Sequence, residues 1–523
     1  MELSLNSLKD REVWENIDIK LPEFNIDEVV KNTENNPKWL HFGAGNIFKA
    51  LICNRYQDLL DKKLVDTGII AVESFDYEVI EAIYKKFDNL SVLVLTKADG
   101  SLEKRVVASV TDAITTRDSK LKEIFINPGL QIVSFTITEK GYGLYKPSGE
   151  YLDIIEDDIK NGLENPTHLM SIITSNLYNR YKNGGAPITV LSMDNCSHNG
   201  DKLKSAVLTI AVKWLKKSFV DQGFIDYIQD RSKVSFPLSM IDKITPRPSD
   251  VFKQDLEKSG LKSMDIVITS KGSYMAPFVN AEISEYLIIE DDFTNGRPEL
   301  EAGGIIFTTR ETVNSVETMK VTTCLNPLHT ALAVTGCLLG YTLISDEMKD
   351  PLLKKLVETI GYNEGLKVVL DPGIINPKEF IDEVIYERFV NPYILDSPQR
   401  IATDTSQKVA IRFGETIKSY IKSETLNVSD LIGIPLAIAS WLKYLTGIDD
   451  SGKTFTLSPD PELDVLKGKI KDVSGVKWIL SNQKIFGLDL YMAGLGDKIE
   501  DMYNEMCSGI GGVRRCLKRY LDM

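Results

Sequence analysis

Length, composition and charge already limit what this chain can be. Its 523 residues predict two domains, and 43% hydrophobic with 26% charged residues is typical of a soluble globular protein. No apolar run approaches the ~20 residues of a membrane span. A formal net charge of −14 argues against a nucleic-acid binder, which needs clustered Lys and Arg. The charged start lacks the apolar core of a signal peptide, so we expect a cytoplasmic protein without membrane or nucleic-acid partners.

Between about residues 38 and 290, short β-rich runs alternate with stretches of helical periodicity. This alternation predicts an α/β domain with a mostly parallel sheet covered by helices. The predicted strands are 68–73, 91–96, 130–138, 187–194 and 264–270, and the predicted helices between them are 77–87, 166–182 and 201–217. The character changes after 289–299 to long helical patterns, among them the almost wholly apolar run 327–341. We therefore predict one domain over 1–300 and a mainly helical domain over 301–523.

The stretch HFGAGNIFKA (41–50) resembles a glycine loop that binds a dinucleotide. A strand-like run leads into Gly43 and Gly45, a helix-like run follows, and the next strand ends on the acidic residue Glu73. In such a loop Gly43 makes the turn, Gly45 lets the pyrophosphate approach, and the carboxylate takes the ribose hydroxyls. Phe48 stands where a third glycine is expected. The alternative is a tight strand-to-helix turn that binds nothing.

Several blocks along the chain resemble the polyol-specific long-chain dehydrogenases. This family includes mannitol 2-dehydrogenase, fructuronate (D-mannonate) reductase and tagaturonate reductase. The blocks occur in the family's order, which is more specific than any one motif. They are 41–50, 136–142 (TITEKGY), 193–200 (MDNCSHNG), 240–246 (MIDKITP), 286–298, 317–333 (ETMKVTTCLNPLHTALA) and 397–413 (SPQRIATDTSQKVAIRF).

The resemblance implies a Rossmann-like N-terminal domain and a metal-independent, NAD-dependent reaction between a secondary alcohol and a ketone. Family members carry an aromatic residue or His at the position of Phe48. The implied cofactor contacts are Gly43, Gly45, Asn46, Ile47, Phe48, Glu73 and Glu139. The implied catalytic residues are Lys320 as general base with Glu317, Asn195, Asn326 and His329, and the implied substrate contacts are Asp194, Asp242, Arg400 and Lys408. One departure is the interval from Lys320 to His329, which is nine residues here instead of the family's eight.

Chemistry supports some of these assignments without the resemblance. Glu317 and Lys320 share a helix face at a spacing of three, although a surface ion pair is the common reading of that spacing. Asn326 before Pro327 predicts a helix N-cap, which places His329 in a first turn that favours a neutral imidazole.

Asp194 and Asn195 lie at the end of a predicted strand, where ligands of open α/β sheets gather, although they could instead cap the next helix. The Asn195 amide could donate to a developing alkoxide together with Asn326. Arg400 and Lys408 could grip substrate oxygens or be solvated surface charges. The six cysteines lack C-x-x-C spacing and the four histidines form no ligand pattern, so we expect no metal site.

We therefore expect an NAD-dependent oxidoreductase acting on a small polyol, ketose or sugar acid, with D-fructuronate and D-mannonate as the first candidate pair. Mannitol 2-dehydrogenase and tagaturonate reductase are alternatives within the family. A catalytically silent NAD-binding sensor and a zinc-dependent alcohol dehydrogenase are alternatives outside it.

Overall fold

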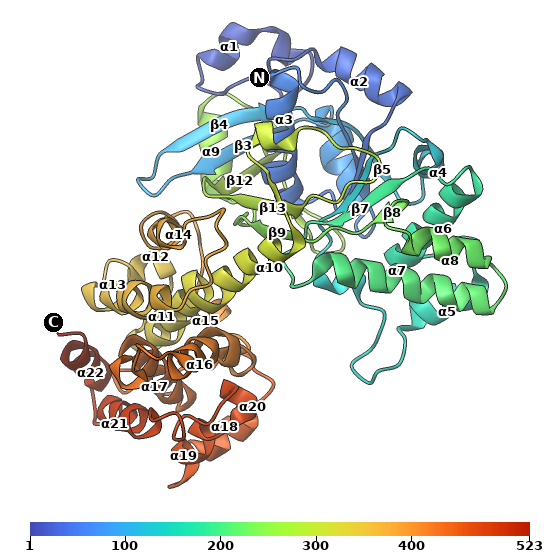
Figure 1. The fold of residues 1–523 in the computed structure, drawn as a ribbon. Coiled ribbons are helices and arrows are strands. Elements are labelled where there is room, and N and C mark those ends of the chain that lie inside the picture. Colours follow the sequence, from blue (N-terminus) through green and yellow to red (C-terminus); the bar gives the residue numbers. More distant parts are fainter. Residues whose placement is uncertain (523) are drawn as a thin grey trace. The chain divides into compact units, whose positions relative to one another are not determined.

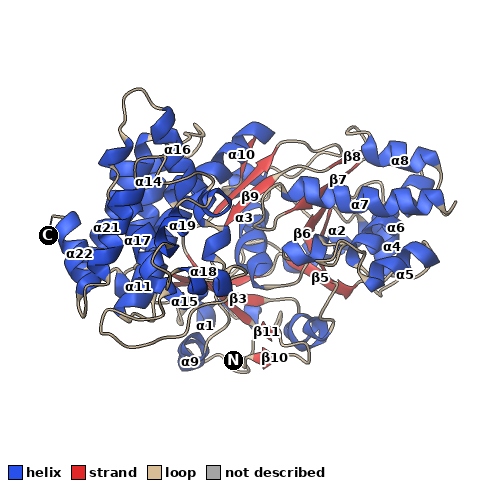
Figure 2. Cartoon of the chain, turned by 90° about the horizontal axis from the view of Figure 1, so that it is seen from below, coloured by secondary structure: helices blue, strands red, loops and turns tan. Residues whose placement is uncertain are grey.

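The computed structural model of the chain describes residues 1–522 and divides the chain into two compact units. The first unit comprises residues 1–96 and 102–314, and the second comprises residues 97–101 and the chain from Ser315 onward. Within the described residues, every named strand lies in the first unit, and the second unit is helical (Figures 1 and 2). The predicted fold class, a Rossmann-like domain followed by a mainly helical one, is confirmed.

The main sheet of the first unit has six parallel strands in the order β5-β2-β1-β6-β7-β8. The chain leaves β1 toward β2 on one side and later returns to β6 on the other side. The carboxyl ends of β1 and β6 therefore flank the point where the strand order reverses, and open α/β sheets bind their ligands at that point. The strands are β1 (Trp39–Phe42), β2 (Ile69–Glu73), β5 (Val110–Thr115), β6 (Ile132–Phe135), β7 (Ile188–Ser192) and β8 (Val234–Ser235).

Three smaller sheets complete the strands of the first unit. Their orders are β12-β3-β4, β14-β13-β9 and β10-β11. The predicted strand 91–96 is β3, but it belongs to the first of these sheets and not to the main sheet. The predicted strand 264–270 is wrong for most of its length, because only Val267 and Ile268 find a pairing partner there. The strands are β3 (Ser91–Thr96), β4 (Leu102–Val107), β9 (Ser239–Asp242), β10 (Val267–Ile268), β11 (Tyr274–Met275), β12 (Phe278–Glu282), β13 (Tyr286–Glu290) and β14 (Ile306–Thr308).

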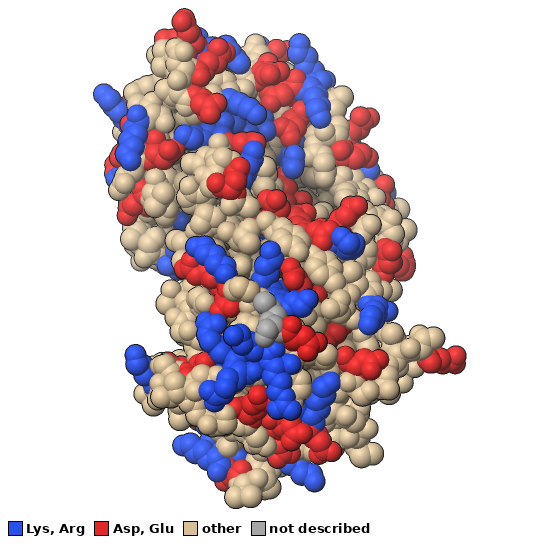
Figure 3. Space-filling model, turned by 90° about the vertical axis from the view of Figure 1, so that its left-hand side faces the viewer, with Lys and Arg blue, Asp and Glu red and all other residues tan. Residues whose placement is uncertain are grey.

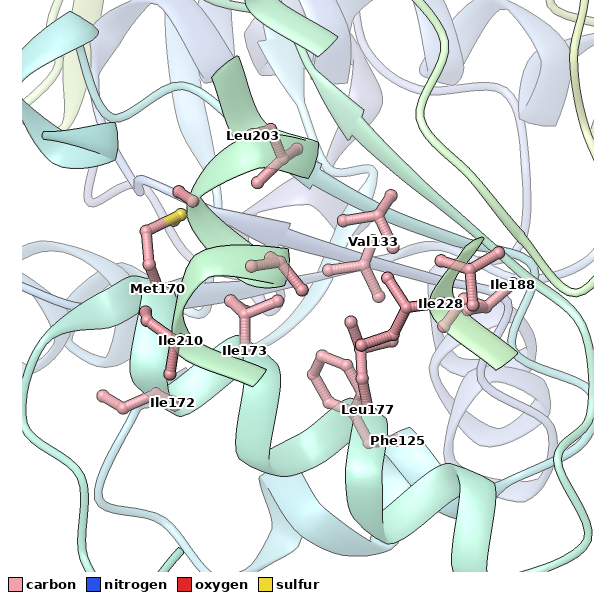
Figure 4. Close-up of a cluster of buried hydrophobic side chains, with 14 of the residues drawn as sticks. Phe125, Val133, Met170, Ile172, Ile173, Leu177, Ile188, Leu203, Ile210 and Ile228 are labelled. Atoms are coloured by element: carbon pink, nitrogen blue, oxygen red, sulfur yellow. The ribbon is translucent and has the colours of Figure 1, made fainter. Parts of the chain in front are cut away.

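Helices cover the main sheet, and a large apolar core lies between them and the strands. Figure 4 shows part of this core, where Val133 of β6 and Ile188 of β7 lie among side chains such as Leu177 of α6. These strands are buried on both faces, which explains their nearly continuous apolar sequence. The helices are α1 (Arg11–Glu15), α2 (Ile26–Asn35), α3 (Asn54–Asp61), α4 (Lys120–Ile126), α5 (Asp153–Asn161), α6 (Leu169–Lys182), α7 (Asn199–Lys216), α8 (Gln222–Gln229) and α9 (Asp250–Lys258).

The second unit is built around α11, which packs against α17, while α17 packs against α21 and α21 against α22. Helix α11 is apolar on nearly all sides, as its sequence predicts, because neighbouring helices surround it. Helix α10 begins in the first unit and ends in the second. The helices are α10 (Arg310–Met319), α11 (Asn326–Leu339), α12 (Ile344–Glu347), α13 (Pro351–Glu358), α14 (Pro377–Glu383), α15 (Pro398–Ile401), α16 (Glu415–Lys422), α17 (Gly433–Leu445), α18 (Leu463–Lys469), α19 (Gly475–Leu480), α20 (Gln483–Phe486), α21 (Gly496–Met506) and α22 (Gly512–Tyr520).

Short π-helical segments interrupt or precede several helices. Such segments insert an extra residue into a helix and occur frequently at functional sites. They replace parts of the helices predicted from periodicity, as at 77–87, where a π-helical and a 3-10 segment follow each other. The π-helical segments are Phe48–Cys53, Ile80–Tyr84, Lys320–Cys324, Thr359–Glu364, Val384–Arg388 and Ala410–Gly414.

The structure also bears on membrane spans, metal sites and the distribution of surface charge. No helix within residues 1–522 combines the length and the apolar composition needed to cross a membrane. In the same residues, no three His, Cys, Asp or Glu side chains are grouped as a metal site requires. On the face shown in Figure 3, Lys and Arg lie interspersed with Asp and Glu, so the net charge of −14 forms no single acidic surface there.

Arg180 on α6 ties three parts of the first unit together. Its side chain is only 1% exposed, and its guanidinium group donates hydrogen bonds to backbone carbonyls in the segments that precede β6 and β7. The acceptors are the carbonyl oxygens of Phe125, Asn127, Leu130, Ala186 and Pro187. A buried cation that donates to several backbone carbonyl groups acts as a structural cross-link.

Replacing this cross-link should destabilise the first unit. Arg180→Met leaves buried carbonyl groups without donors, at about 1–3 kcal/mol for each group that water cannot reach. We expect the free energy of unfolding to fall by about 3–5 kcal/mol in urea denaturation followed by tryptophan fluorescence. The exposed neighbour Lys182 on the same helix provides the control, and Lys182→Met should change stability by less than about 0.5 kcal/mol. Equal effects of the two substitutions would contradict the structural role of Arg180.

Candidate active site

The glycine loop after β1 has the backbone geometry that a pyrophosphate requires. Gly43 has a φ of +101°, and a Cβ atom there would lie 2.1 Å from the carbonyl oxygen of Thr136. Only glycine fits this position. A Cβ at Gly45, in contrast, would meet no atom within 4 Å, so the space beside its backbone is open. Gly43 therefore makes the turn, and Gly45 offers the room for a phosphate to approach the start of the helix.

The next residues fit a dinucleotide as well. The chain is helical from Asn46 onward, and both Asn46 and Ile47 are partly buried. The Oδ1 atom of Asn46 is enclosed and has no hydrogen-bond partner among the described residues. An enclosed polar atom without a partner indicates a missing ligand or water. The loop thus combines an open backbone, a helix start and an unsatisfied amide.

Phe48 takes the place of the third glycine by packing into the core. Its side chain is 0% exposed and stacks on the His41 ring at a centroid distance of 4.0 Å. Hydrogen bonds of 2.7 and 2.8 Å join the two ring nitrogens of His41 to the hydroxyl groups of Ser134 and Thr136. Burial lowers the pKa of His41 to about 3, so this ring is neutral. The Phe48 side chain therefore cannot reach a cofactor, and only its backbone could contribute to the predicted contact.

The Glu73 carboxylate at the end of β2 holds the surrounding backbone in place. One oxygen accepts a hydrogen bond from the Ala44 N–H at 3.1 Å, which joins β2 to the glycine loop. The other oxygen accepts from the N–H groups of Ser74, Phe75 and Asp76. The residue is 8% exposed. Glu73 thus places a negative charge where the ribose is predicted to bind. Both of its carboxylate oxygens, however, already accept hydrogen bonds from backbone N–H groups.

Asp194 plays a similar part at the end of β7. Its carboxylate accepts hydrogen bonds from the N–H groups of Ile137 and Thr138 at 3.0 and 2.7 Å and from the Tyr142 hydroxyl at 2.5 Å. Burial raises the pKa of Asp194 above its usual value, against the effect of these bonds. Through these hydrogen bonds, Asp194 holds the block 136–142 in place.

The other predicted residues of the first unit differ widely in exposure. Asn195 is exposed, and Asp242 is buried at the end of β9. Glu139, the predicted cofactor contact in the block 136–142, is exposed and forms an ion pair with Lys202. The structure thus leaves Asn195 and Glu139 accessible to a ligand, whereas Asp242 lies inside the protein.

In the second unit, Lys320 begins a π-helical segment at the end of α10. Its side chain is 3% exposed, so it is not the solvated half of a surface ion pair. Glu317, one turn earlier, is partly buried. The Leu325 N–H donates to the Lys320 carbonyl at 3.1 Å, a bond that closes a π turn. This turn is wider than an α-helical turn and holds one more residue.

The start of α11 differs from the prediction at Asn326. Leu325 occupies the N-cap position and gives no side-chain cap, while Asn326 and Pro327 are the first helical residues. The expected cap by the Asn326 side chain is therefore wrong. The cause is the π turn, which ends at Leu325 and leads directly into the helix. The Asn326 carboxamide forms no hydrogen bond with the described residues and stays available for a ligand.

His329 lies in the first turn of α11 beside a cluster of cations. Its Nε2 atom has no hydrogen-bond partner among the described residues and lies 3.7 Å from Oδ2 of Asp396. Burial, together with the positive charges nearby, lowers the pKa of His329 to about 3, and Arg412 has the largest effect among these charges. The imidazole is neutral, as predicted, although burial and the cations are the causes here. The cations in order of effect are Arg412, Arg400, Arg388 and Lys408.

The members of this cation cluster come from the segment that follows α14. Arg400 on α15 is exposed and forms an ion pair with Asp396. Lys408 donates to the carbonyl oxygen of Thr403, and Arg412 donates to the hydroxyl group of Thr330. Both predicted substrate contacts, Arg400 and Lys408, therefore lie near His329. Sequence reasoning missed Arg412, although its position four residues after Lys408 in the same block was the available signal.

Two protein-family models match the chain. The mannitol dehydrogenase Rossmann domain matches residues 37–302, and the mannitol dehydrogenase C-terminal domain matches residues 312–507. The matches thus contain the glycine loop of the first unit and the catalytic candidates of the second.

Individual proteins agree with this assignment. The chain is 51% identical to the D-mannonate oxidoreductase of Thermotoga maritima, over 99% of this chain and 98% of that protein. It is 28% identical to the polyol:NADP oxidoreductase of Gluconobacter oxydans, over 84% of this chain and 85% of that protein. A solved structure, the Pseudomonas fluorescens mannitol 2-dehydrogenase in a ternary complex with NAD and D-mannitol, is 26% identical with a TM-score of 0.71, and 100% of both chains is covered. The chain belongs to the mannitol dehydrogenase family and is an oxidoreductase that acts on a CH–OH group.

Proposed function

We propose that this protein interconverts D-fructuronate and D-mannonate with NAD as the coenzyme. The observation that carries the proposal is the cluster of four cations beside His329, because the carboxylate of a sugar acid is attracted to such a cluster. The 51% identity to a D-mannonate oxidoreductase over nearly the whole of both chains supports the same substrate.

The proposal divides the work between residues 1–300, which bind the dinucleotide, and residues 301–523, which bind the substrate and exchange the proton. Gly43, Gly45, Asn46 and the backbone of the following turn hold the pyrophosphate. The nicotinamide ring, when bound, supplies or accepts the hydride. The negative charge of Glu73 disfavours the extra phosphate of NADP. Glu139 is the remaining proposed contact with the cofactor.

In the second unit, Lys320 takes the proton of the alcohol as general base and returns it in ketone reduction. Glu317, one helical turn away, passes that proton toward solvent. The Asn326 carboxamide and the neutral His329 ring donate hydrogen bonds to the reacting oxygen. Arg400 and Lys408 hold other substrate oxygens. Asn195, Asp194 and Asp242 of the first unit stay predicted catalytic or substrate contacts.

A mannitol 2-dehydrogenase is the second candidate, because the solved structure with NAD and D-mannitol covers the whole chain. A spectrophotometric screen of NADH oxidation separates the candidates. We expect the highest kcat/KM with D-fructuronate, and lower values with tagaturonate and fructose. A preference for fructose would favour the mannitol dehydrogenase instead, and a preference for tagaturonate would favour a tagaturonate reductase.

The first catalytic prediction concerns Lys320. Lys320→Ala should lower turnover by about 10²–10⁴-fold, the usual contribution of a positioned acid–base group, because no other group then takes the proton directly. NADH binding, measured by fluorescence, should persist. Lys355→Ala, which removes an exposed lysine of the same unit, should leave turnover unchanged. Near-normal rates in Lys320→Ala would rule out this residue as the base.

The second prediction uses the pKa of His329, which is about 3 and thus well below the usual 6.5. The ring stays neutral across the working range, so His329→Asn should lower kcat/KM without altering the shape of its pH profile. The unfolded chain binds a proton more readily than the folded one, so the wild type should lose stability as pH falls from about 6.5 toward 3. His329→Asn should lose less over that range in thermal unfolding. A pH profile that changes shape would show that His329 takes part in proton transfer.

The third prediction concerns coenzyme choice. Glu73→Gln removes the negative charge but keeps an oxygen that can accept from the Ser74, Phe75 and Asp76 N–H groups. We expect the ratio of kcat/KM for NADP to that for NAD to rise by about 10-fold, since like charges at short range cost roughly this much. Glu123→Gln on the exposed side of α4 is the control. An unchanged ratio with intact NAD binding would mean that Glu73 only fixes the loop.

A further inference from the structure

Arg412 is held rigidly beside the candidate catalytic helix. It lies in the π-helical segment Ala410–Gly414, whose Phe413 is fully buried and whose Gly414 is packed tightly. A Cβ atom at Gly414 would lie 2.1 Å from the carbonyl oxygen of Phe486, so the segment cannot shift toward α20. The Arg412 N–H donates to the Lys408 carbonyl at 3.0 Å, which fixes the two cations on successive turns.

The guanidinium group is linked to the residues that are proposed to hold the reacting oxygen. Its Nη1 atom donates to the hydroxyl group of Thr330, and that hydroxyl donates to the Asn326 carbonyl at 2.9 Å. Thr330 directly follows His329. A single chain of hydrogen bonds therefore sets the position of Arg412 relative to both Asn326 and His329.

Arg412 is half-buried and has few partners within the chain. A guanidinium group carries five N–H donors, and Thr330 is its one side-chain partner among the described residues. No carboxylate of residues 1–522 forms an ion pair with it. Arg180, which is 1% exposed, meets five carbonyl oxygens instead. The contrast indicates that the donors of Arg412 are kept for a group that is not part of the chain.

The surrounding charges favour an anion. Arg412 acts on His329 together with three other cations, whereas the acid beside His329, Asp396, already accepts from Arg400. Burial lowers the pKa of Arg412 to about 10, and burial together with the charge of Arg412 lowers that of Lys408. Both shifts reflect cations that are partly withdrawn from water, and at Lys408 the nearby Asp404 and Asp460 offset the shift only in part.

We propose that Arg412 binds the carboxylate of the substrate and thereby makes this protein select sugar acids over uncharged polyols. The planar fork of a guanidinium group matches a carboxylate with two parallel hydrogen bonds. Lys408, one turn earlier, adds a second positive charge. The inference rests on the proposed function and names the residue that recognises the acidic end of the substrate.

The test compares an acidic and a neutral substrate in the same variants. Arg412→Gln removes the charge, and Arg412→Lys keeps it without the fork. We expect kcat/KM for D-fructuronate reduction to fall by about 10- to 150-fold in Arg412→Gln and by less in Arg412→Lys. The value for fructose should change by less than about threefold, and NADH affinity should stay the same. Arg515→Gln, which removes an exposed arginine of the same unit, should affect neither substrate.

The outcomes separate this inference from the function on which it rests. A wild type that reduces D-fructuronate, combined with equal losses for both substrates in Arg412→Gln and Arg412→Lys, would overturn the role of Arg412 alone. Unchanged D-fructuronate kinetics in Arg412→Gln would do the same. A wild type that reduces fructose but not D-fructuronate would overturn the proposed function, and the inference with it, whatever the variants show.

Discussion

The close approach of the backbone at Gly43 to the carbonyl of Thr136 is the constraint on which the first unit depends. It exists because β1 and β6 are neighbouring parallel strands whose ends converge at the point where the strand order reverses. Two buried carboxylates then fix the loops on either side of this approach. Glu73 gathers N–H groups at the end of β2, and Asp194 gathers N–H groups at the end of β7. Both carboxylates thus turn flexible loop backbone into a preorganised surface for a ligand.

In the second unit, helical segments hold the candidate site residues in place. Two π-helical segments, Lys320–Cys324 and Ala410–Gly414, each place a cation next to the start of α11. The wide turn at Lys320 also delivers Asn326 as the first helical residue, which frees its side chain from capping. An apolar helix that is surrounded by its neighbours supplies the rigid support, and the polar groups are confined to its first turn.

Local patterns in the sequence predicted much of this structure, and non-local contacts account for what they missed. Hydrophobic periodicity predicts the helices α6, α7 and α11. The two glycines that follow it predict the end of the strand before Gly43. The run 91–96 was predicted as a strand, but its parallel partner β12 lies more than 180 residues away, and no local pattern reveals that pairing. Asp194 is predicted as a substrate contact from its place at the end of a strand. Its hydrogen bonds to Ile137, Thr138 and Tyr142 join it to another loop, which no local pattern reveals.

Arg180 and Arg412 show how one residue type serves two purposes. Burying a guanidinium group is costly unless its donors and its charge are satisfied. Arg180 meets that requirement within the chain, by carbonyl groups that fold around it, and so contributes stability in the absence of any ligand. Arg412 meets it only in part, through one hydroxyl group, and lies among other cations. An anion bound to Arg412, as proposed, would satisfy its remaining donors, and by thermodynamic linkage it would stabilise the folded unit. In a protein with a formal net charge of −14, such a local group of cations would favour anion binding beside the Thr330 hydroxyl, the Asn326 amide and the His329 imidazole rather than elsewhere.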